Sequence, residues 1–240
     1  MDPSETGPMC WLAITPPEGE ADAELLHLWR ASRLPFARGG LLLRTPGTSW
    51  REVLDDPRLA DVAALAEASG LLRFVAVAAS VAPRADAVER LRAAKVGVHL
   101  KRGWGPLQVK GWLATGLPLG LSGHVGDPPL PAELGGRVRY TTFAPVFRPR
   151  TEVASDAGSD TPAAKPPVGL EALRSRAQRE LAPLLALGGI DGDNAESALA
   201  SGARGVASIR AFFGPPGDIL NTGRALARAL ATHVSTTRTR

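Results

Sequence analysis

The stretch Ala186-Leu187-Gly188-Gly189-Ile190 and the later stretch Gly205-Val206-Ala207-Ser208-Ile209 are short apolar runs that each break into small residues. Between them lies a helical pattern from Asp193 to Ala200, which Gly202 follows. This order predicts a strand, a loop, a helix, a strand and a second loop. Such loops expose backbone N–H groups, and a helix start adds a favourable dipole, so together they can hold a phosphate without a basic side chain.

Apolar, strand-like runs alternate with helical patterns along the whole chain, which favours a parallel α/β fold. We expect strands at Cys10–Ile14, Gly40–Leu43, Arg73–Ala78, Val96–Leu100, Pro118–Leu121, Val138–Thr142, Leu184–Leu187 and Gly205–Ser208. We expect helices at Ala21–Ser32, Ser49–Ala68, Arg84–Ala94, Leu107–Thr115, Pro129–Leu134, Leu170–Leu181, Asp193–Ala200 and Gly217–Thr232.

Eight strands in strict alternation with eight helices predict a single (β/α)8 TIM barrel over residues 1–240, rather than a doubly wound sheet of about five or six strands. The phosphate site of such barrels often lies after strands seven and eight. The two stretches quoted first occupy these places. The sequence therefore predicts that the chain binds a phosphorylated small molecule.

Composition narrows the class of protein. The 240 residues are 44% hydrophobic and 22% charged, with a net charge of +4. The basic residues are mostly scattered arginines, so we expect no nucleic-acid partner. No apolar run approaches the roughly 20 residues that span a membrane. The polar start from Met1 to Met9 is no secretory signal, and the single Cys10 fits a reducing compartment. We expect a cytoplasmic protein and leave a homo-oligomer open.

Two local patterns add detail. Ser49 and Glu52 form a predicted capping box at the start of the second helix. The segment 148–168 is polar and non-periodic, and it lies on the face where the strands end, so it is either a lid or a tolerated surface insertion. The basic tail 235–240 is expected to be a frayed helix end.

Five motifs, in this order along the chain, resemble those of the thiamine phosphate synthase/TenI family. They are Gly97-Val98-His99-Leu100, Gly120-Leu121-Ser122-Gly123-His124, Ala144-Pro145-Val146-Phe147 with the later Gly169-Leu170-Glu171, Leu187-Gly188-Gly189-Ile190, and Gly205-Val206-Ala207-Ser208-Ile209. The likeness runs from about Gly97 to Gly214 and continues more weakly upstream. It implies a barrel of thiamine biosynthesis that binds a thiazole phosphate or thiamine phosphate.

The chain also departs from the pattern of the family's synthases, which grip a pyrimidine diphosphate with Q-x-R-x-K on strand two. Here Arg44 is retained, but Leu42 and Pro46 replace the glutamine and the lysine. The synthases also hold Mg²⁺ with carboxylates after strands three and four. Here strand three ends in small residues, and strand four is followed by Lys101-Arg102. Because Mg²⁺ needs oxygen ligands, we expect no metal site, and Mg²⁺ would be a cofactor only of a synthase.

The resemblance assigns roles to single residues. His124 is the candidate proton carrier, because imidazole exchanges a proton near neutral pH, although an ordinary loop histidine explains it as well. Ser122 either donates to a substrate or caps a turn. His99, inside an apolar run, is favoured as a hydrogen-bonded core residue over a catalytic one. We expect the backbone at Gly188, Gly189, Ala207 and Ser208 to bind phosphate.

Residues around the mouth of the predicted barrel are further candidates. Arg44 is a candidate anion ligand, and Lys165 on the segment 148–168 either closes over an anion or is a solvated loop lysine. Arg148 and Arg150 add positive charge or are plain surface residues. Trp104 either stacks on a planar heterocycle or packs in the core.

Three functions follow from these assignments. The first is a TenI-like thiazole tautomerase, an isomerase that needs no metal. The second is a divergent thiamine phosphate synthase, a transferase in which Arg44, Lys101 and Arg102 neutralise the diphosphate. The third is a catalytically silent ligand-binding barrel.

Overall fold

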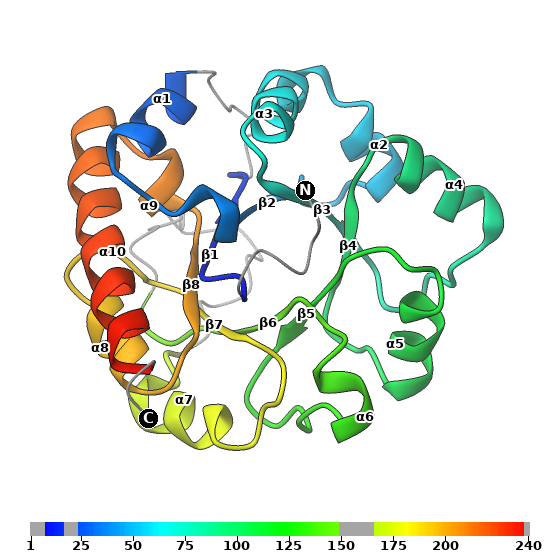
Figure 1. The fold of residues 1–240 in the computed structure, drawn as a ribbon. Coiled ribbons are helices and arrows are strands. Elements are labelled where there is room, and N and C mark those ends of the chain that lie inside the picture. The colour runs from blue at the N-terminus through cyan, green and yellow to red at the C-terminus, as the bar shows by residue number, and fades with distance from the viewer. Residues whose placement is uncertain (1–7, 17–23, 149–165, 238–240) are drawn as a thin grey trace, which may run out of the picture.

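The computed structural model describes residues 8–16, 24–148 and 166–237. Eight parallel strands pair in sequence order, and β8 also pairs with β1, so that the sheet closes into a barrel. Figure 1 looks along this barrel, with the strands around the centre and the helices outside them. The strands are β1 (Trp11–Ile14), β2 (Gly39–Leu43), β3 (Leu72–Val77), β4 (Gly97–Leu100), β5 (Leu119–Gly123), β6 (Tyr140–Phe143), β7 (Leu184–Leu187) and β8 (Gly205–Ser208).

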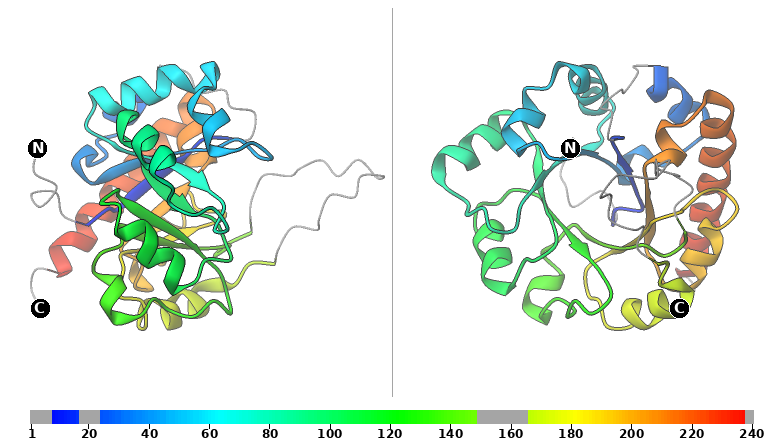
Figure 2. Two further views of the ribbon diagram at one scale, coloured as in Figure 1. Left: turned by 90° about the vertical axis from the view of Figure 1, so that its right-hand side faces the viewer. Right: turned by 180° about the vertical axis from the view of Figure 1, so that it is seen from behind.

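The helices form an outer layer that the side and rear views display (Figure 2). They are α1 (Glu24–Ala31), a 3-10 turn η1 (Phe36–Arg38), α2 (Trp50–Leu54), α3 (Pro57–Ala68), α4 (Ala85–Ala93), α5 (Pro106–Leu113), α6 (Ala132–Gly135), α7 (Gly169–Ala177), α8 (Ala195–Ala200), α9 (Arg210–Phe213) and α10 (Pro216–Thr237). Within the described ranges, no helix combines the length and the apolar character needed to cross a membrane.

The predicted (β/α)8 barrel is confirmed, and all eight predicted strands are present with ends that shift by two residues at most. The helix predicted over Ser49–Ala68 is wrong in one respect, because it is two helices. Ser49 and Glu52 form the expected capping box, but Asp56 caps a new helix whose first residue is Pro57. An Asp-Pro pair is a start signal, since proline is favoured at the first helical position.

Helix α7 ends at Ala177, four residues before the predicted end at Leu181. After β8, the chain differs from the prediction in two further ways. The short helix α9 directly after β8 was not predicted. Helix α10 runs to Thr237, so residues 235–237 of the predicted frayed tail are helical. Neither difference alters the barrel.

Alternation along the strands divides the core into two parts. One set of strand side chains, which includes the buried Trp11, points outward and packs in one cluster with helix side chains such as Trp29 of α1 and Trp112 of α5. The other set fills the inside of the barrel, with Leu12, Leu42, Phe74, Tyr140, Leu185 and Ala207 among its members. Space inside is tight, because a Cβ on Gly120 would overlap the ring of Tyr140.

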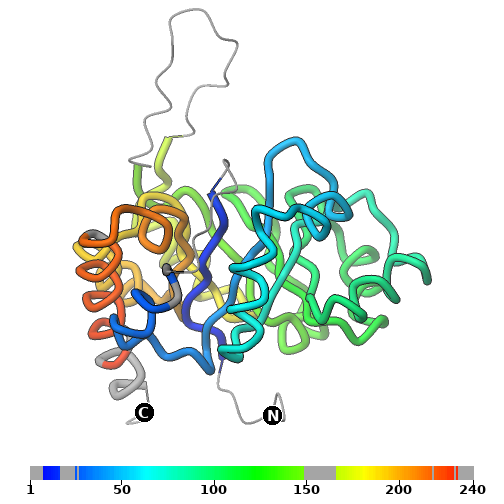
Figure 3. Tube along the Cα trace, turned by 90° about the horizontal axis from the view of Figure 1, so that it is seen from above, coloured from blue at the N-terminus to red at the C-terminus, as the bar shows by residue number. Residues whose placement is uncertain are grey.

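The carboxyl ends of the strands meet at one face of the barrel, where active sites of this fold lie. The segment after β6 and the segment before α7 meet at this face. Val168 N–H donates to the carbonyl of Pro145 (2.9 Å) and Gly169 N–H to that of Val146 (3.1 Å). These bonds hold the two segments side by side at the edge of the barrel (Figure 3).

Closure of the barrel depends on the absence of a side chain at Gly205. A Cβ there would overlap the carbonyl of Cys10, which accepts the ladder hydrogen bond of Val206 N–H (3.1 Å). We expect Gly205→Ala to destabilise the fold by about 3 kcal/mol, since backbone must move. Urea denaturation measures this loss. Gly136→Ala is the matched control, because a Cβ there meets nothing within 4 Å, and an equal effect in both variants would contradict the packing argument.

Candidate functional site

The loop after β7 has a backbone that only glycine adopts readily. Gly188 has φ +94° and Gly189 has φ +64°. A Cβ on Gly188 would lie 2.6 Å from Cα of Pro145, and one on Gly189 would lie 2.5 Å from the carbonyl oxygen of Arg148. Both glycines are therefore required by conformation and by close packing against the segment that follows β6.

Hydrogen bonds hold this loop in place. Asn194 Nδ2 donates to the carbonyl of Gly189 (2.7 Å). The Ser208 hydroxyl donates to the carbonyl of Ile190 (3.1 Å) and accepts from Ala211 N–H (3.3 Å), so it joins the β7 loop to the start of α9. The N–H groups of Gly188 and Gly189 have no hydrogen-bond partner among the described residues. They are thus available to an anion.

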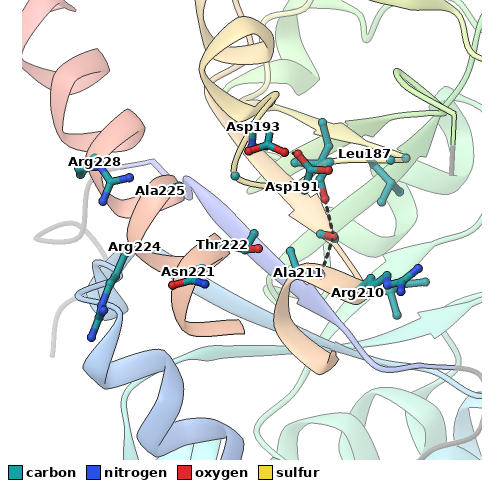
Figure 4. A pocket seen from close by; sticks show the side chains of 16 residues that line it. Leu187, Asp191, Asp193, Arg210, Ala211, Asn221, Thr222, Arg224, Ala225 and Arg228 are labelled. Atoms are coloured by element: carbon teal, nitrogen blue, oxygen red, sulfur yellow. Dashed lines mark hydrogen bonds between the residues drawn. The ribbon is translucent and has the colours of Figure 1, made fainter. Parts of the chain in front are cut away.

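A pocket of about 880 Å³ opens at this loop. Gly188, Gly189 and Ser208 line it together with residues of α9 and α10, whereas Ala207 is fully buried inside the barrel. Figure 4 shows Arg210 of α9 on one side and Asn221, Thr222 and Arg228 of α10 on the other. Three of the four residues predicted to bind phosphate through their backbone therefore share one pocket.

His99 lies inside the barrel in a chain of hydrogen bonds. Its Nδ1 is 2.9 Å from the hydroxyl of Tyr140, and its Nε2 is 2.8 Å from the hydroxyl of Ser122. Burial, followed by the positive charges of Arg44 and Lys101, lowers the pKa of His99 from 6.5 to about 3. Trp104 Nε1–H donates to the carbonyl of Ser122 (2.7 Å), so its indole supports this strand end.

His124 lies just beyond β5, with its side chain 22% exposed. Its Nδ1 is 3.5 Å from Oδ2 of Asp127, which also accepts from the backbone N–H of His124 (2.8 Å). Sequence analysis missed Asp127, although its place three residues after His124 is a local signal for a side-chain bond back to a backbone N–H. This carboxylate holds the turn and lies close to the imidazole.

His124 and the glycine loop line two different pockets. The His124 pocket has a volume of about 420 Å³ and includes Arg102, Pro145 and Val168. Pro145 also contacts the loop after β7, where it leaves no room for a side chain on Gly188. The two pockets are therefore neighbours, because Pro145 of one touches Gly188 of the other.

Arg176 of α7 holds the turn that contains His124 and Asp127 in place. Its guanidinium donates to the carbonyl of Asp127 (2.6 Å) and to the carboxylate of Glu180 (2.7 Å). Both side chains of this ion pair are almost fully buried. The i,i+4 spacing of the two residues is a sequence signal for an ion pair. The spacing does not indicate whether the pair is exposed or buried, or which other groups the arginine contacts.

Three cationic residues lie at the mouth of the barrel, after the ends of β2 and β4. Nε of Arg44 is buried and has no hydrogen-bond partner among the described residues, and burial lowers the pKa of its guanidinium. Lys101 and Arg102 are exposed and form no ion pair within the same residues. These positions do not fit Mg²⁺, and no group of three His, Cys, Asp or Glu side chains in the described part of the chain could hold a metal.

The remaining candidates are readily placed. Lys165 and Arg150 lie outside the described residues, and Arg148 is exposed. Cys10 is buried in β-sheet packing, and burial raises its pKa to about 11. Asp86 forms an ion pair with Arg51 of α2 (3.0 Å) and lines neither pocket, so it brings no carboxylate to the site.

The pKa of His99 predicts a pH dependence of stability. Between its folded value of about 3 and its unfolded value near 6.5, only the unfolded chain binds the proton. The stabilisation is therefore complete above about pH 6.5 and is lost as the pH falls toward 3. We expect the free energy of unfolding to fall more steeply with acid than in His99→Gln, by at most about 1.4 kcal/mol per pH unit. Urea denaturation between about pH 7 and pH 4 tests this, and parallel curves would contradict it.

The buried ion pair predicts a second effect on stability. Arg176→Met leaves the carboxylate of Glu180 buried without its partner, and we expect a cost of about 3–5 kcal/mol. The double change Arg176→Met/Glu180→Leu should recover most of this loss, as followed by urea denaturation. Arg174→Met, at an exposed arginine of the same helix, is the control and should be nearly neutral. A double variant as unstable as the single one would refute this reading.

Two solved structures illustrate the proteins that share this barrel fold. Thiamine phosphate pyrophosphorylase from Pyrococcus furiosus superimposes with a TM-score of 0.62 at 22% identity, over 94% of this chain and 97% of that one. TrpF from Jonesia denitrificans superimposes with a TM-score of 0.60 at 15% identity, over 94% and 98% of the chains. At these identities the likeness shows the barrel fold alone.

Sequence relatives narrow the family. Thiamine-phosphate synthase from Roseiflexus sp. (strain RS-1) is 34% identical over 128 residues, which are 46% of this chain and 54% of that protein. Thiamine-phosphate synthase from Methanocella arvoryzae is 37% identical over 116 residues, 48% and 50% of the two chains. The chain thus spans about half the length of the curated relatives it matches.

The family model described as thiamine monophosphate synthase matches residues 58–212, well over half of the chain. The match contains β3 to β8 with the His99–Ser122 interior, the His124 turn and both loops of the larger pocket. The matched residues therefore include all five motifs whose sequence resembles that of the family. The chain belongs to the thiamine monophosphate synthase family.

Proposed function

We propose that this protein binds a thiazole phosphate and moves a proton on its ring, as a thiazole tautomerase. The observation that carries this proposal is the position of His124 and its partner Asp127 beside a loop with two unpartnered N–H groups, Gly188 and Gly189. In the proposed complex, these N–H groups hold the phosphate. The ring then extends past Pro145 toward His124.

His124 is suited to move the proton in both directions. The neutral imidazole accepts a proton from a ring carbon, and the imidazolium returns it at another ring position, which shifts the double bonds. Asp127, 3.5 Å from Nδ1, stabilises the imidazolium between the two transfers. No leaving group has to be neutralised in this reaction, so it does not need Mg²⁺ held by carboxylates at the strand ends.

A second function, the divergent synthase, is favoured by one specific observation. Arg44 is a buried guanidinium whose Nε has no partner among the described residues, and its charge, like that of Lys101, acts on His99. Two such cations at the barrel mouth can attract a diphosphate. The silent ligand-binding barrel remains the outcome if the ligand binds but is not converted.

Calorimetric titration with thiazole phosphate, combined with a turnover assay, tests the proposal. We expect Gly189→Ala to weaken binding at least tenfold, since the loop must shift away from Arg148. We expect His124→Gln to keep the affinity and to lose a factor of about 10²–10⁴ in turnover. The controls are Gly217→Ala, where a Cβ meets nothing within 4 Å, and His27→Gln at an exposed histidine.

The outcomes separate the three functions. Binding and turnover of thiazole phosphate alone support the tautomerase. Product that forms only when a pyrimidine diphosphate is added supports the synthase, and binding without any product supports the silent barrel. Full activity of His124→Gln would remove His124 from the mechanism, and absence of binding would refute the proposal as a whole.

A further inference from the structure

Basic residues stand where strands of the barrel begin. Arg73 is the second residue of β3, and Arg139 and Arg204 directly precede β6 and β8. Arg38 directly precedes β2, and Lys95 lies two residues before β4. These cations are scattered along the sequence, but parallel strands all begin at one face, so the barrel gathers them around its N-terminal end. This face is the lower edge of Figure 3.

Hydrogen bonds place these cations at the first residues of the sheet. Arg139 N–H donates to the carbonyl of Leu119, the first residue of β5 (2.8 Å), and Arg204 N–H donates to that of Leu184, the first residue of β7 (2.8 Å). Helix ends and loops at the same face add four exposed arginines, which are Arg33, Arg92, Arg137 and Arg179. These four and the five residues at the strand starts are called the basic ring below.

Most charges of the basic ring are not neutralised by a carboxylate. Arg73 and Lys95 share Glu67, each at 2.8 Å. The other members of the ring form no ion pair in the part of the chain that the structure describes. The buried Glu180 at this end of the barrel is matched by Arg176. The N-terminal face is therefore positively charged.

Helix dipoles explain only part of the basic ring. A helix dipole stabilises a cation in the last turn, where Arg92 of α4 lies. Arg139 and Arg204 lie four residues beyond the ends of α6 and α8, and the effect fades within one turn. Arg73 belongs to a strand, and sheets have only small net dipoles. The cations at the strand starts thus stabilise no helix, and an anionic partner is the remaining explanation for their charge.

An exposed leucine lies among these arginines. Leu181, three residues before β7, is 60% exposed. A Cβ on Gly135 would lie 2.5 Å from that of Leu181, so the leucine packs directly over this glycine. Arg137 and Arg179 are each two residues away from this contact. An apolar side chain between arginines is suited to a lipid surface, where it enters the boundary between headgroups and acyl chains.

The arrangement of the basic ring favours a planar partner. Cations that encircle the end of a barrel can all contact a plane at once, whereas a rod such as double-stranded DNA meets those along one line. Single-stranded nucleic acids stack on aromatic side chains. The large apolar side chains that are exposed in the described ranges are Leu107, Val125 and Leu181, and none of them is aromatic. Anionic headgroups attract each arginine or lysine near a bilayer surface.

We infer that the N-terminal face of the barrel docks on an anionic lipid bilayer. The basic ring then contacts the headgroup phosphates, and Leu181 enters the boundary with the acyl chains. In this orientation both pockets, which open where the strands end, face away from the bilayer and stay accessible to substrate. The inference goes beyond the proposed function and does not depend on it.

Sedimentation with lipid vesicles tests the docking. The probes are vesicles of phosphatidylcholine alone and vesicles of an equimolar mixture of phosphatidylcholine and phosphatidylglycerol. We expect the unchanged protein to sediment with the mixed vesicles only, and to be released as salt screens the attraction. Equal binding to both kinds of vesicle, or binding to neither, would overturn the inference.

A triple variant tests whether the basic ring carries the binding. Arg137→Gln/Arg179→Gln/Arg204→Gln removes three exposed charges from this face. We expect partition into the mixed vesicles to fall about 100-fold, which is about fivefold for each cation. Because the three side chains are exposed, the midpoint of urea denaturation should stay unchanged.

The matched control removes the same net charge from the opposite face. Arg84 precedes α4, Arg102 follows β4 and Arg148 follows β6, and all three are exposed. Arg84→Gln/Arg102→Gln/Arg148→Gln should therefore bind the mixed vesicles nearly as the unchanged protein does. An equal loss in both triple variants would mean that net charge alone drives the binding, and the docking face would be wrong.

Leu181→Gln separates a bilayer from other polyanions. We expect this variant to bind the mixed vesicles about fivefold more weakly, since its apolar contact is lost, and to bind short double-stranded DNA as the unchanged protein does. Unchanged binding of Leu181→Gln to the vesicles would overturn the lipid surface. Tighter binding of the unchanged protein to the DNA than to the mixed vesicles would overturn it as well.

Discussion

The pairing of β8 with β1 is the constraint on which the remaining structure depends. Because the sheet closes, every second residue of each strand enters one small interior, and the carboxyl ends of all strands meet at one face. The consecutive pairing of β4, β5 and β6 makes His99, Ser122 and Tyr140, which are distant in sequence, hydrogen-bonded neighbours inside this barrel. The direct pairing of β6 with β7 brings the loop after β7 against the segment after β6, where Pro145 and Gly188 touch.

The fold was largely accessible from the sequence because each strand is a short apolar run bounded by clear breaks. The β7 and β8 boundaries at Leu184–Leu187 and Gly205–Ser208 agree with the prediction residue for residue. The helical layer was harder, since amphipathic periodicity continues across the break at Asp56-Pro57 and hides it. Helix α9 has only four residues, which are too few to show an amphipathic periodicity, so no sequence pattern indicated it.

The site was accessible only in part, because it depends on contacts between strands. Gly188 and Gly189 were found from their place after a strand, and their positive φ angles explain their identity. His124 and this loop line separate pockets because of the path of the chain at Pro145. The periodicity of the sequence does not predict this path. The support of the His124 turn by Arg176 joins residues 49 positions apart, so no local rule could predict it.

The hydrogen-bonded interior depends on Gly120, which has no side chain that could take part in it. Tyr140 occupies the space that a side chain on Gly120 would fill. The two positions thus form one steric unit, in which the small residue on β5 permits the large one on β6. In a relative with any larger residue at position 120, the tyrosine would have to give way. Both positions would then change together, and His99 would lose its hydrogen-bond partner on β6.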